Sequence, residues 1–321
     1  MSNSGTVLVE TIGLKKHFPA GKRKLHAVDG VDLRIERGST LGVVGESGCG
    51  KTTLGRTILG LLPATDGKIL FEGRDVTHCD KKQFKAMRRE MQIIFQDPYS
   101  SINPRHSIKK TIAEPLLVNG IIRDRHQREE RVRELMETVG LARRLENSYP
   151  HELDGGRRQR VGIARALAVN PKFIVCDEPV SALDVSVQAQ VLNLLMDLQQ
   201  QLGLTYLFIT HDLSVVRHIS TEIAVMYLGQ CIERGPAKEL FRSPLHPYTR
   251  ALISAIPIPS AKARETRTEV IHGELTSPID PQPGCRFAAR CPQAGPRCTG
   301  RDLPLRDMGG GRHVACVLYG E

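Results

Sequence analysis

A glycine-rich loop ending in Lys-Thr constrains this chain more than any other feature. Residues 45–53 read Gly-Glu-Ser-Gly-Cys-Gly-Lys-Thr-Thr, after an apolar run at 39–44 and before another at 54–62. The first run predicts a buried strand and the second a helix. Glycines let consecutive backbone N–H groups point into one loop, and the N-terminus of the next helix adds partial positive charge. A strand, this loop and a helix in that order predict a phosphate-binding P-loop.

The side chains of this loop have separate predicted roles. Lys51 is expected to reach the β- and γ-phosphates of a nucleotide, and Thr52 to offer its hydroxyl to Mg²⁺. Cys49 is interpreted as a small residue that fits the loop, with a redox role as the less favoured alternative. The predicted nucleotide-binding residues of the loop are Gly45, Glu46, Ser47, Gly48, Cys49, Gly50, Lys51, Thr52 and Thr53.

Two carboxylates follow a second apolar stretch, at residues 172–176. At the end of a strand beside a P-loop, Asp177 is expected to coordinate Mg²⁺, usually through water. Glu178 is then placed to polarise an attacking water. The alternative is a helix start, which Pro179 would fit. His211 follows a predicted strand at 205–210 and can donate a hydrogen bond to a γ-phosphate, although a strand-end histidine alone is more often structural.

A long segment separates the P-loop from the two carboxylates. Residues 121–147 are charged and have a helical period, which predicts an inserted helical lobe. Before this lobe stands Phe95-Gln96-Asp97-Pro98, where Gln96 can coordinate Mg²⁺ or water and sit at the hinge of the lobe.

These motifs together resemble the ATP-binding subunit of an ABC transporter, over about residues 6–255. In chain order they are the P-loop (45–52), the Q-loop residue Gln96, the signature region (153–157), the Walker B strand (173–178), the D-loop Ser181-Ala182-Leu183-Asp184, and His211. The resemblance implies an α/β P-loop NTPase fold with an antiparallel β lobe, a RecA-like core and a helical lobe. We expect this domain at residues 6–256, with the helical lobe at about 97–168.

Further stretches resemble the oligopeptide/dipeptide importer branch: the interior of the P-loop, Ser243-Pro244-Leu245-His246-Pro247-Tyr248-Thr249, and a cysteine-bearing extension at 257–321. The resemblance implies an ATPase that uses ATP and Mg²⁺ and works as a head-to-tail dimer. It also implies two membrane-spanning permease subunits, indirect contact with an extracytoplasmic solute-binding protein, and a place at the cytoplasmic face of the membrane. Phe18 resembles the adenine-stacking aromatic, with core packing as an equal alternative.

The signature region departs from the family. The usual Leu-Ser-Gly-Gly-Gln is here Leu153-Asp154-Gly155-Gly156-Arg157. Asp154 would place a negative charge near the γ-phosphate held by the opposite subunit. At about 4 Å and an effective dielectric constant of about 20, one such pair costs about 4 kcal/mol. Asp154 is also a good N-cap for the helix that starts here.

From this departure we hypothesise an asymmetric dimer. The P-loop, Asp177, Glu178 and His211 look intact, whereas the signature donated by Asp154, Gly155 and Gly156 looks impaired. The chain is therefore expected to pair with a non-identical ATP-binding subunit. The alternative is that Arg157 substitutes functionally and both ATP sites work.

Four cysteines crowd the end of the chain, as Cys285-x5-Cys291-x6-Cys298-x17-Cys316. Four thiols can hold Zn²⁺ or an iron–sulfur cluster. The spacings are longer than in common zinc knuckles, and the family resemblance favours a 4Fe–4S cluster with a structural role. Zinc and free thiols remain alternatives.

Composition narrows the function classes. No apolar run approaches about 18 residues, and no secretory signal is visible. The net charge of +10 suits a nucleotide, a polyanion or an anionic membrane. Aromatic residues make up only 4% and Trp is absent, which disfavours a stacking surface for single-stranded nucleic acid. No nucleic-acid partner is expected. ABC ATPases of DNA repair would carry a long coiled coil between the P-loop and Walker B, and those of translation would carry two ATPase cassettes in one chain. This sequence shows neither feature, which disfavours both classes. The open alternatives are import of nickel, glutathione or oligosaccharide, and a subunit that mainly binds ATP.

Overall fold

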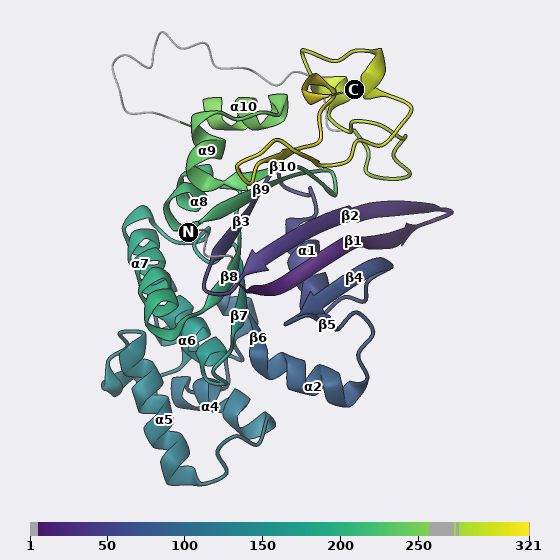
Figure 1. The fold of residues 1–321 in the computed structure, drawn as a ribbon. Coiled ribbons are helices and arrows are strands. Elements are labelled where there is room, and N and C mark those ends of the chain that lie inside the picture. Colours follow the sequence, from purple (N-terminus) through teal and green to yellow (C-terminus); the bar gives the residue numbers. More distant parts are fainter. Residues whose placement is uncertain (1–5, 257–272, 274–275, 321) are drawn as a thin grey trace, which may run out of the picture. The chain divides into compact units, whose positions relative to one another are not determined.

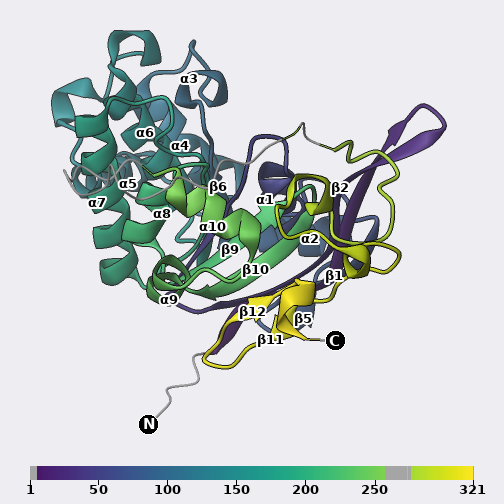
Figure 2. The same cartoon turned by 90° about the horizontal axis from the view of Figure 1, so that it is seen from above.

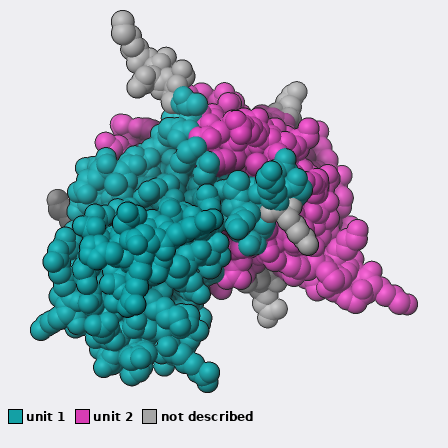
Figure 3. All heavy atoms as spheres, turned by 90° about the horizontal axis from the view of Figure 1, so that it is seen from below, with its two compact units in different colours: residues 1–6, 36–39, 79–208 teal, residues 7–35, 40–78, 209–321 magenta. Residues whose placement is uncertain are grey.

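The computed structural model describes residues 6–256, 273 and 276–320 (Figure 1). Within these residues the chain forms two compact units (Figure 3). Unit 1 holds residues 36–39 and 79–208 together with Thr6, and unit 2 holds residues 7–35, 40–78 and those from 209 onward. Residues 257–272 and 274–275, at the start of the expected cysteine-bearing extension, lie outside the described residues.

An antiparallel sheet in unit 2 has the strand order β2-β1-β4-β5. Its strands are β1 (Val7–Ala20), β2 (Arg23–Glu36), β4 (Asp66–Phe71) and β5 (Arg74–Asp75). β2 alternates in burial: Val31, Leu33 and Ile35 are at most 1% exposed, whereas the residues between them face outward. This period of two is what a sheet with one buried face requires.

The strand before the P-loop also lies in unit 2. β3 (Thr40–Val44) is buried at every residue, which confirms the predicted strand. It runs parallel to β9 (Glu222–Tyr227), which is followed in strand order by β10 (Gln230–Pro236), β12 (His313–Val314) and β11 (Arg306–Asp307). The helices of this unit are α1 (Lys51–Ile58), α8 (Leu213–Ile219), α9 (Ala237–Arg242) and α10 (Pro247–Ser254). The predicted helix after the loop is therefore confirmed, although it ends at Ile58.

Unit 1 combines parallel strands with a group of helices (Figure 1). β6 (Met91–Ile94) is parallel to β7 (Phe173–Asp177), and β8 (Thr205–Ile209) follows β7 in the strand order. The helices are α2 (Lys81–Glu90), α3 (Pro98–Ser101), α4 (Ile108–Val118), α5 (Arg125–Thr138), α6 (Gly155–Leu167) and α7 (Val185–Leu202).

The helical interior of unit 1 is built where α4 packs against α5 and α6. Leu116, Val132 and Val161 are all fully buried there. α5 confirms the helix predicted from the charged period, and it begins where the Asp124 carboxylate accepts the Gln127 backbone N–H at 2.8 Å.

The C-terminal segment, residues 276–320, belongs to unit 2 and is made of short elements (Figure 2). They are the strands β11 and β12 and the 3-10 turns η4 (Ala288–Arg290), η5 (Pro296–Cys298) and η6 (Val317–Tyr319). β12 extends the sheet antiparallel to β10, with Val314 opposite Glu233. In the part of the chain that the structure describes, no helix is long and apolar enough to cross a membrane.

Candidate functional site

The P-loop of unit 2 is a closely packed turn around the Lys51 side chain. Lys51 is 5% exposed, and its ammonium donates to the Gly45 carbonyl at 2.7 Å and the Glu46 carbonyl at 2.9 Å. Gly50 has a φ of 102°, and a Cβ there would lie 1.9 Å from the Ala27 carbonyl oxygen. Only glycine fits this position, so the sequence pattern and the backbone geometry agree.

Cys49 lies on the inner side of the same loop and is 3% exposed. Burial raises the pKa of its thiol, which outweighs the opposing effect of the nearby Lys51 ammonium. A buried thiol with a raised pKa is a poor nucleophile. These properties favour the interpretation of Cys49 as a small residue that fits the loop.

The two predicted carboxylates stand at the end of β7 in unit 1. Asp177 is 2% exposed at the last position of the strand. Glu178 follows it with a φ of 46°, a left-handed conformation that is rare for a residue with a side chain. Its carboxylate accepts a hydrogen bond of 2.8 Å from the Gln96 side-chain amide. Two sequence-predicted residues that are far apart in the chain therefore meet in unit 1.

The signature region forms the N-terminus of α6, also in unit 1. The Asp154 carboxylate accepts the Arg157 backbone N–H at 2.7 Å, so Asp154 is the N-cap of this helix. Its other oxygen lies 3.5 Å from the Arg157 guanidinium, in a pair whose side chains are at least half exposed. This exposed ion pair contributes little to stability, but it places the positive charge of Arg157 beside the Asp154 carboxylate.

The glycines of the signature permit close packing against the D-loop and α7. A Cβ at Gly155 would lie 3.0 Å from the Leu183 side chain, and one at Gly156 would lie 2.5 Å from the Val187 side chain. Asp184 caps α7 by accepting the Val187 backbone N–H at 3.0 Å. Its hydrogen bond with the Ser186 hydroxyl lowers the pKa of its carboxyl group, so it stays ionised at neutral pH.

The two remaining predicted nucleotide contacts belong to unit 2. Phe18 is half-buried near the end of β1, and the Lys16 ammonium lies 4.8 Å from the centre of its ring. His211 is exposed and precedes α8.

The four C-terminal cysteines lie in the turns of the C-terminal segment. The Cys285 backbone N–H donates to the Cys298 carbonyl at 2.8 Å, which brings two of them side by side. Gly284 permits this approach, because its φ is 128° and a Cβ would lie 2.6 Å from the same carbonyl. Burial, together with the charges of the other three cysteines, raises the pKa of Cys285 to about 11.

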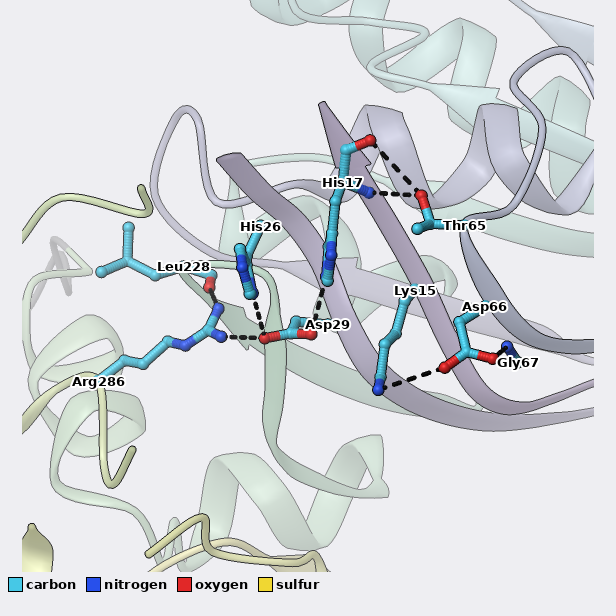
Figure 4. A network of polar contacts seen from close by, with 9 residues as sticks. All are labelled: Lys15, His17, His26, Asp29, Thr65, Asp66, Gly67, Leu228 and Arg286. Atoms are coloured by element: carbon cyan, nitrogen blue, oxygen red, sulfur yellow. Dashed lines mark hydrogen bonds and ion pairs between the residues drawn. The ribbon is translucent and has the colours of Figure 1, made fainter. Parts of the chain in front are cut away.

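A polar network that sequence reasoning missed joins the C-terminal segment to the antiparallel sheet of unit 2 (Figure 4). The Asp29 carboxylate faces His17 and His26, at 2.9 Å from each imidazole, and the two rings stack at 3.9 Å. The Arg286 guanidinium donates to the same carboxylate and to the Leu228 carbonyl. Hydrogen bonds from both imidazoles and the charge of Arg286 lower the pKa of Asp29, against the opposing effect of burial.

A second connection from the C-terminal segment reaches the P-loop itself. Arg290 forms two hydrogen bonds with the Glu46 carboxylate, of 2.9 and 3.2 Å. The two residues are 244 positions apart, so no local pattern in the sequence could have indicated the pair.

The motif Ser243–Thr249 has a structural explanation. Glu233 of β10 accepts the backbone N–H groups of Leu245 at 2.8 Å and His246 at 2.7 Å. The Tyr248 hydroxyl oxygen accepts the Glu46 backbone N–H at 2.9 Å. The motif therefore links the sheet to the P-loop.

Comparisons with known proteins agree with this architecture. Residues 28–181 match the family model described as ABC transporter, and residues 232–298 match that of the oligopeptide/dipeptide transporter C-terminal region. The chain is 50% identical to the putative oligopeptide transport ATP-binding protein YkfD of Bacillus subtilis, over 97% of this chain and 95% of that protein. It is 51% identical to the oligopeptide transport ATP-binding protein OppF of Escherichia coli, over 97% and 96%.

Solved structures show the same fold. An ATP-binding cassette solved as a dimer in a post-hydrolysis state bound to ADP and Pi is similar, with a TM-score of 0.65 and 28% identity, over 72% of this chain and 99% of that one. The protein cbiO1 from Clostridium perfringens, part of an ABC transporter complex, has a TM-score of 0.67 and 27% identity, over 74% and 92%. The predicted ABC-type α/β fold is thus confirmed, and the chain belongs to the ATP-binding proteins of ABC transporters, in the oligopeptide/dipeptide branch.

Proposed function

We propose that this chain hydrolyses ATP to drive peptide uptake through a membrane transporter. The observation that carries the proposal is the P-loop, in which Lys51 is buried against the loop carbonyls, in a chain half identical to proteins named for oligopeptide transport. Relatives named for dipeptide transport, such as DppF of Escherichia coli at 49% identity, make peptides the favoured cargo. Nickel, glutathione and oligosaccharide remain alternative cargoes.

The proposed roles follow from the chemistry of each side chain. The P-loop would bind the phosphates, and Thr52, Gln96 and Asp177 would hold Mg²⁺ directly or through water. Glu178 would polarise the attacking water and His211 would contact the γ-phosphate. Phe18 would stack on the adenine. Asp154, Gly155, Gly156 and Asp184 would serve the ATP held by the opposite subunit.

The same family relationship implies partners. We propose that residues 6–256 form the ATP-binding domain and residues 257–321 the extension. The chain would lie at the cytoplasmic face of the membrane on two permease subunits, with the solute-binding protein on the other side. Its signature favours a non-identical second ATPase subunit, because Asp154 is unsuited to the γ-phosphate of an opposite ATP.

We further propose that Cys285, Cys291, Cys298 and Cys316 hold a 4Fe–4S cluster. Three observations support the fit. Each of three thiols accepts a backbone N–H from the residue two positions later: Cys285 from Phe287, Cys291 from Gln293, and Cys316 from Leu318. Besides burial, the charges of the other three cysteines raise the pKa of Cys285, the charges of Cys291 and Cys298 raise that of Cys316, and the charge of Cys298 raises that of Cys291. Cys285 and Cys298 also line a common pocket of about 660 Å³. Bound iron would favour the thiolates.

Two measurements test these proposals. Affinity purification of the chain from its native membrane should recover two permease subunits and a second ATPase subunit, with ATPase activity stimulated by peptide and a loaded binding protein. Recovery of the chain only with itself, or stimulation by nickel or an oligosaccharide instead, would contradict the partner or cargo assignment. Anaerobic purification should give iron and acid-labile sulfide in equal amounts, lost in Cys291→Ser. Zinc in their place, or no metal, would contradict the cluster.

A further inference from the structure

The contact between Arg290 and Glu46 joins the C-terminal segment to the phosphate-binding loop. It is a bidentate ion pair, with Nη1 to Oε2 at 2.9 Å and Nη2 to Oε1 at 3.2 Å. The Arg290 side chain is 10% exposed and that of Glu46 is 25% exposed. Two parallel charge-assisted hydrogen bonds at this degree of burial fix the geometry of the pair and are stronger than a surface ion pair.

Glu46 occupies an important position in the loop. Its backbone carbonyl accepts a hydrogen bond from the Lys51 ammonium at 2.9 Å, and its backbone N–H donates to the Tyr248 hydroxyl. Its carboxylate is therefore attached to the backbone that positions the phosphate-binding lysine. If this carboxylate were unpaired, its negative charge would repel the phosphates of a nucleotide in the loop.

Arg290 is held in place by the C-terminal segment. It ends the turn η4, where its backbone N–H donates to the Phe287 carbonyl at 2.9 Å, and its Nη1 also donates to the Tyr227 hydroxyl at 3.2 Å. The turn is seated by Phe287, which is 1% exposed and packs edge-on against Tyr227 and Tyr248, with 5.3 Å between ring centres in each case. Cys285 and Cys291 flank this turn on either side.

We propose that Arg290 is a positioning residue for nucleotide binding: it holds and neutralises Glu46, so that the fold of the C-terminal segment sets the ATP affinity of the P-loop. The inference rests on the proposed function. It extends that function, because it gives the cysteine-bearing extension a role at the ATP site.

A binding assay on the full chain tests this role without the need for transport partners. Titration with a fluorescent ATP analogue and Mg²⁺ is expected to show about tenfold weaker binding in Arg290→Met, because the Glu46 carboxylate beside the phosphates then loses its charged hydrogen-bond partner. Met keeps much of the packing volume of Arg and removes its charge. Arg297→Met, at an exposed arginine of the same segment, is the matched control and should bind like the unaltered chain. Circular dichroism verifies that each variant is folded.

A double variant tests whether Arg290 acts by neutralising the Glu46 carboxylate or only by its packing in the C-terminal segment. Glu46→Gln alone removes the carboxylate that needs Arg290, so we expect Glu46→Gln/Arg290→Met to bind within about threefold of Glu46→Gln, which is non-additive. Cys291→Ser should weaken binding in the unaltered chain but not further in Arg290→Met. Binding by Arg290→Met within about twofold of the unaltered chain, or a double variant as weak as Arg290→Met, would overturn the inference. Failure of the unaltered chain to bind the nucleotide would overturn the proposed function itself.

Discussion

Gln96 donates a hydrogen bond of 2.8 Å to the Glu178 carboxylate, and so connects the start of the inserted helical segment to the residue proposed as the base. The acceptor is a carboxylate that must orient a water molecule during hydrolysis. Gln96 precedes Asp97, which caps α3 by accepting the Tyr99 backbone N–H at 2.8 Å. Movement of α3 would therefore be transmitted to the Glu178 carboxylate through the side-chain amide of Gln96.

Glu178→Gln is expected to lower ATP turnover about 100-fold or more while nucleotide binding is retained, because a positioned base contributes about 10²–10⁴-fold. Gln96→Ala should lower turnover by less, since it removes one hydrogen bond to the base and leaves the base in place. Gln127→Ala, an exposed glutamine of α5, is the control. Single-turnover hydrolysis and nucleotide binding measure the two effects separately. Unchanged turnover in Glu178→Gln would refute the assignment.

The left-handed backbone of Glu178 leads to a second prediction. A φ of 46° costs a residue with a Cβ about 1 kcal/mol relative to glycine. Both Glu178→Gly and Glu178→Ala should lose hydrolysis, but the glycine variant should be more stable than the alanine variant by about 1 kcal/mol in urea unfolding. Equal stability of the two variants would show that the backbone relaxes without cost.

The signature gives a third prediction. Asp154→Ser combined with Arg157→Gln should raise the total ATPase activity of the complete transporter, because the negative charge facing the opposite γ-phosphate is removed. Serine can still cap α6, so the stability of the chain should be retained. Asp154→Ala, in contrast, should lower the free energy of unfolding by about 1 kcal/mol through loss of the cap. No rise in ATPase activity would leave Asp154 with a capping role only.

The parts of the site that could be predicted are those encoded in contiguous sequence. The P-loop, the strand ending in Asp177 and the cap at Asp154 each depend on residues within a few positions of one another, where backbone geometry limits the possibilities. Gln96 and Glu178 were each predicted as site residues, but the hydrogen bond between them was not. The pairs Arg290–Glu46 and Arg286–Asp29 join the two ends of the chain, and many arginines could have paired with either carboxylate. Only the packing of the C-terminal segment selects these partners.

The burial of His246 leads to a prediction about pH. His246 is 1% exposed, and burial lowers the pKa of its imidazole from 6.5 to about 3. Its Nδ1 accepts the Tyr248 backbone N–H at 3.1 Å, and within the described residues its buried Nε2 has no hydrogen-bond partner. The unfolded chain therefore gains a proton below pH 6.5 that the folded chain does not, so stability is present above pH 6.5 and is lost as the pH falls toward 3.

This group should account for about 1.4 kcal/mol of stability lost between pH 7.5 and 5.5. Burial raises the pKa of the neighbouring Glu233, which works in the opposite direction at lower pH, so the comparison must be between variants. His246→Asn keeps an acceptor for the Tyr248 N–H and cannot be protonated. It should be less stable than the unaltered chain at pH 7.5, but should lose less stability on acidification, as measured by urea unfolding at both pH values. Parallel pH profiles for the two proteins would show that His246 is not the titrating group.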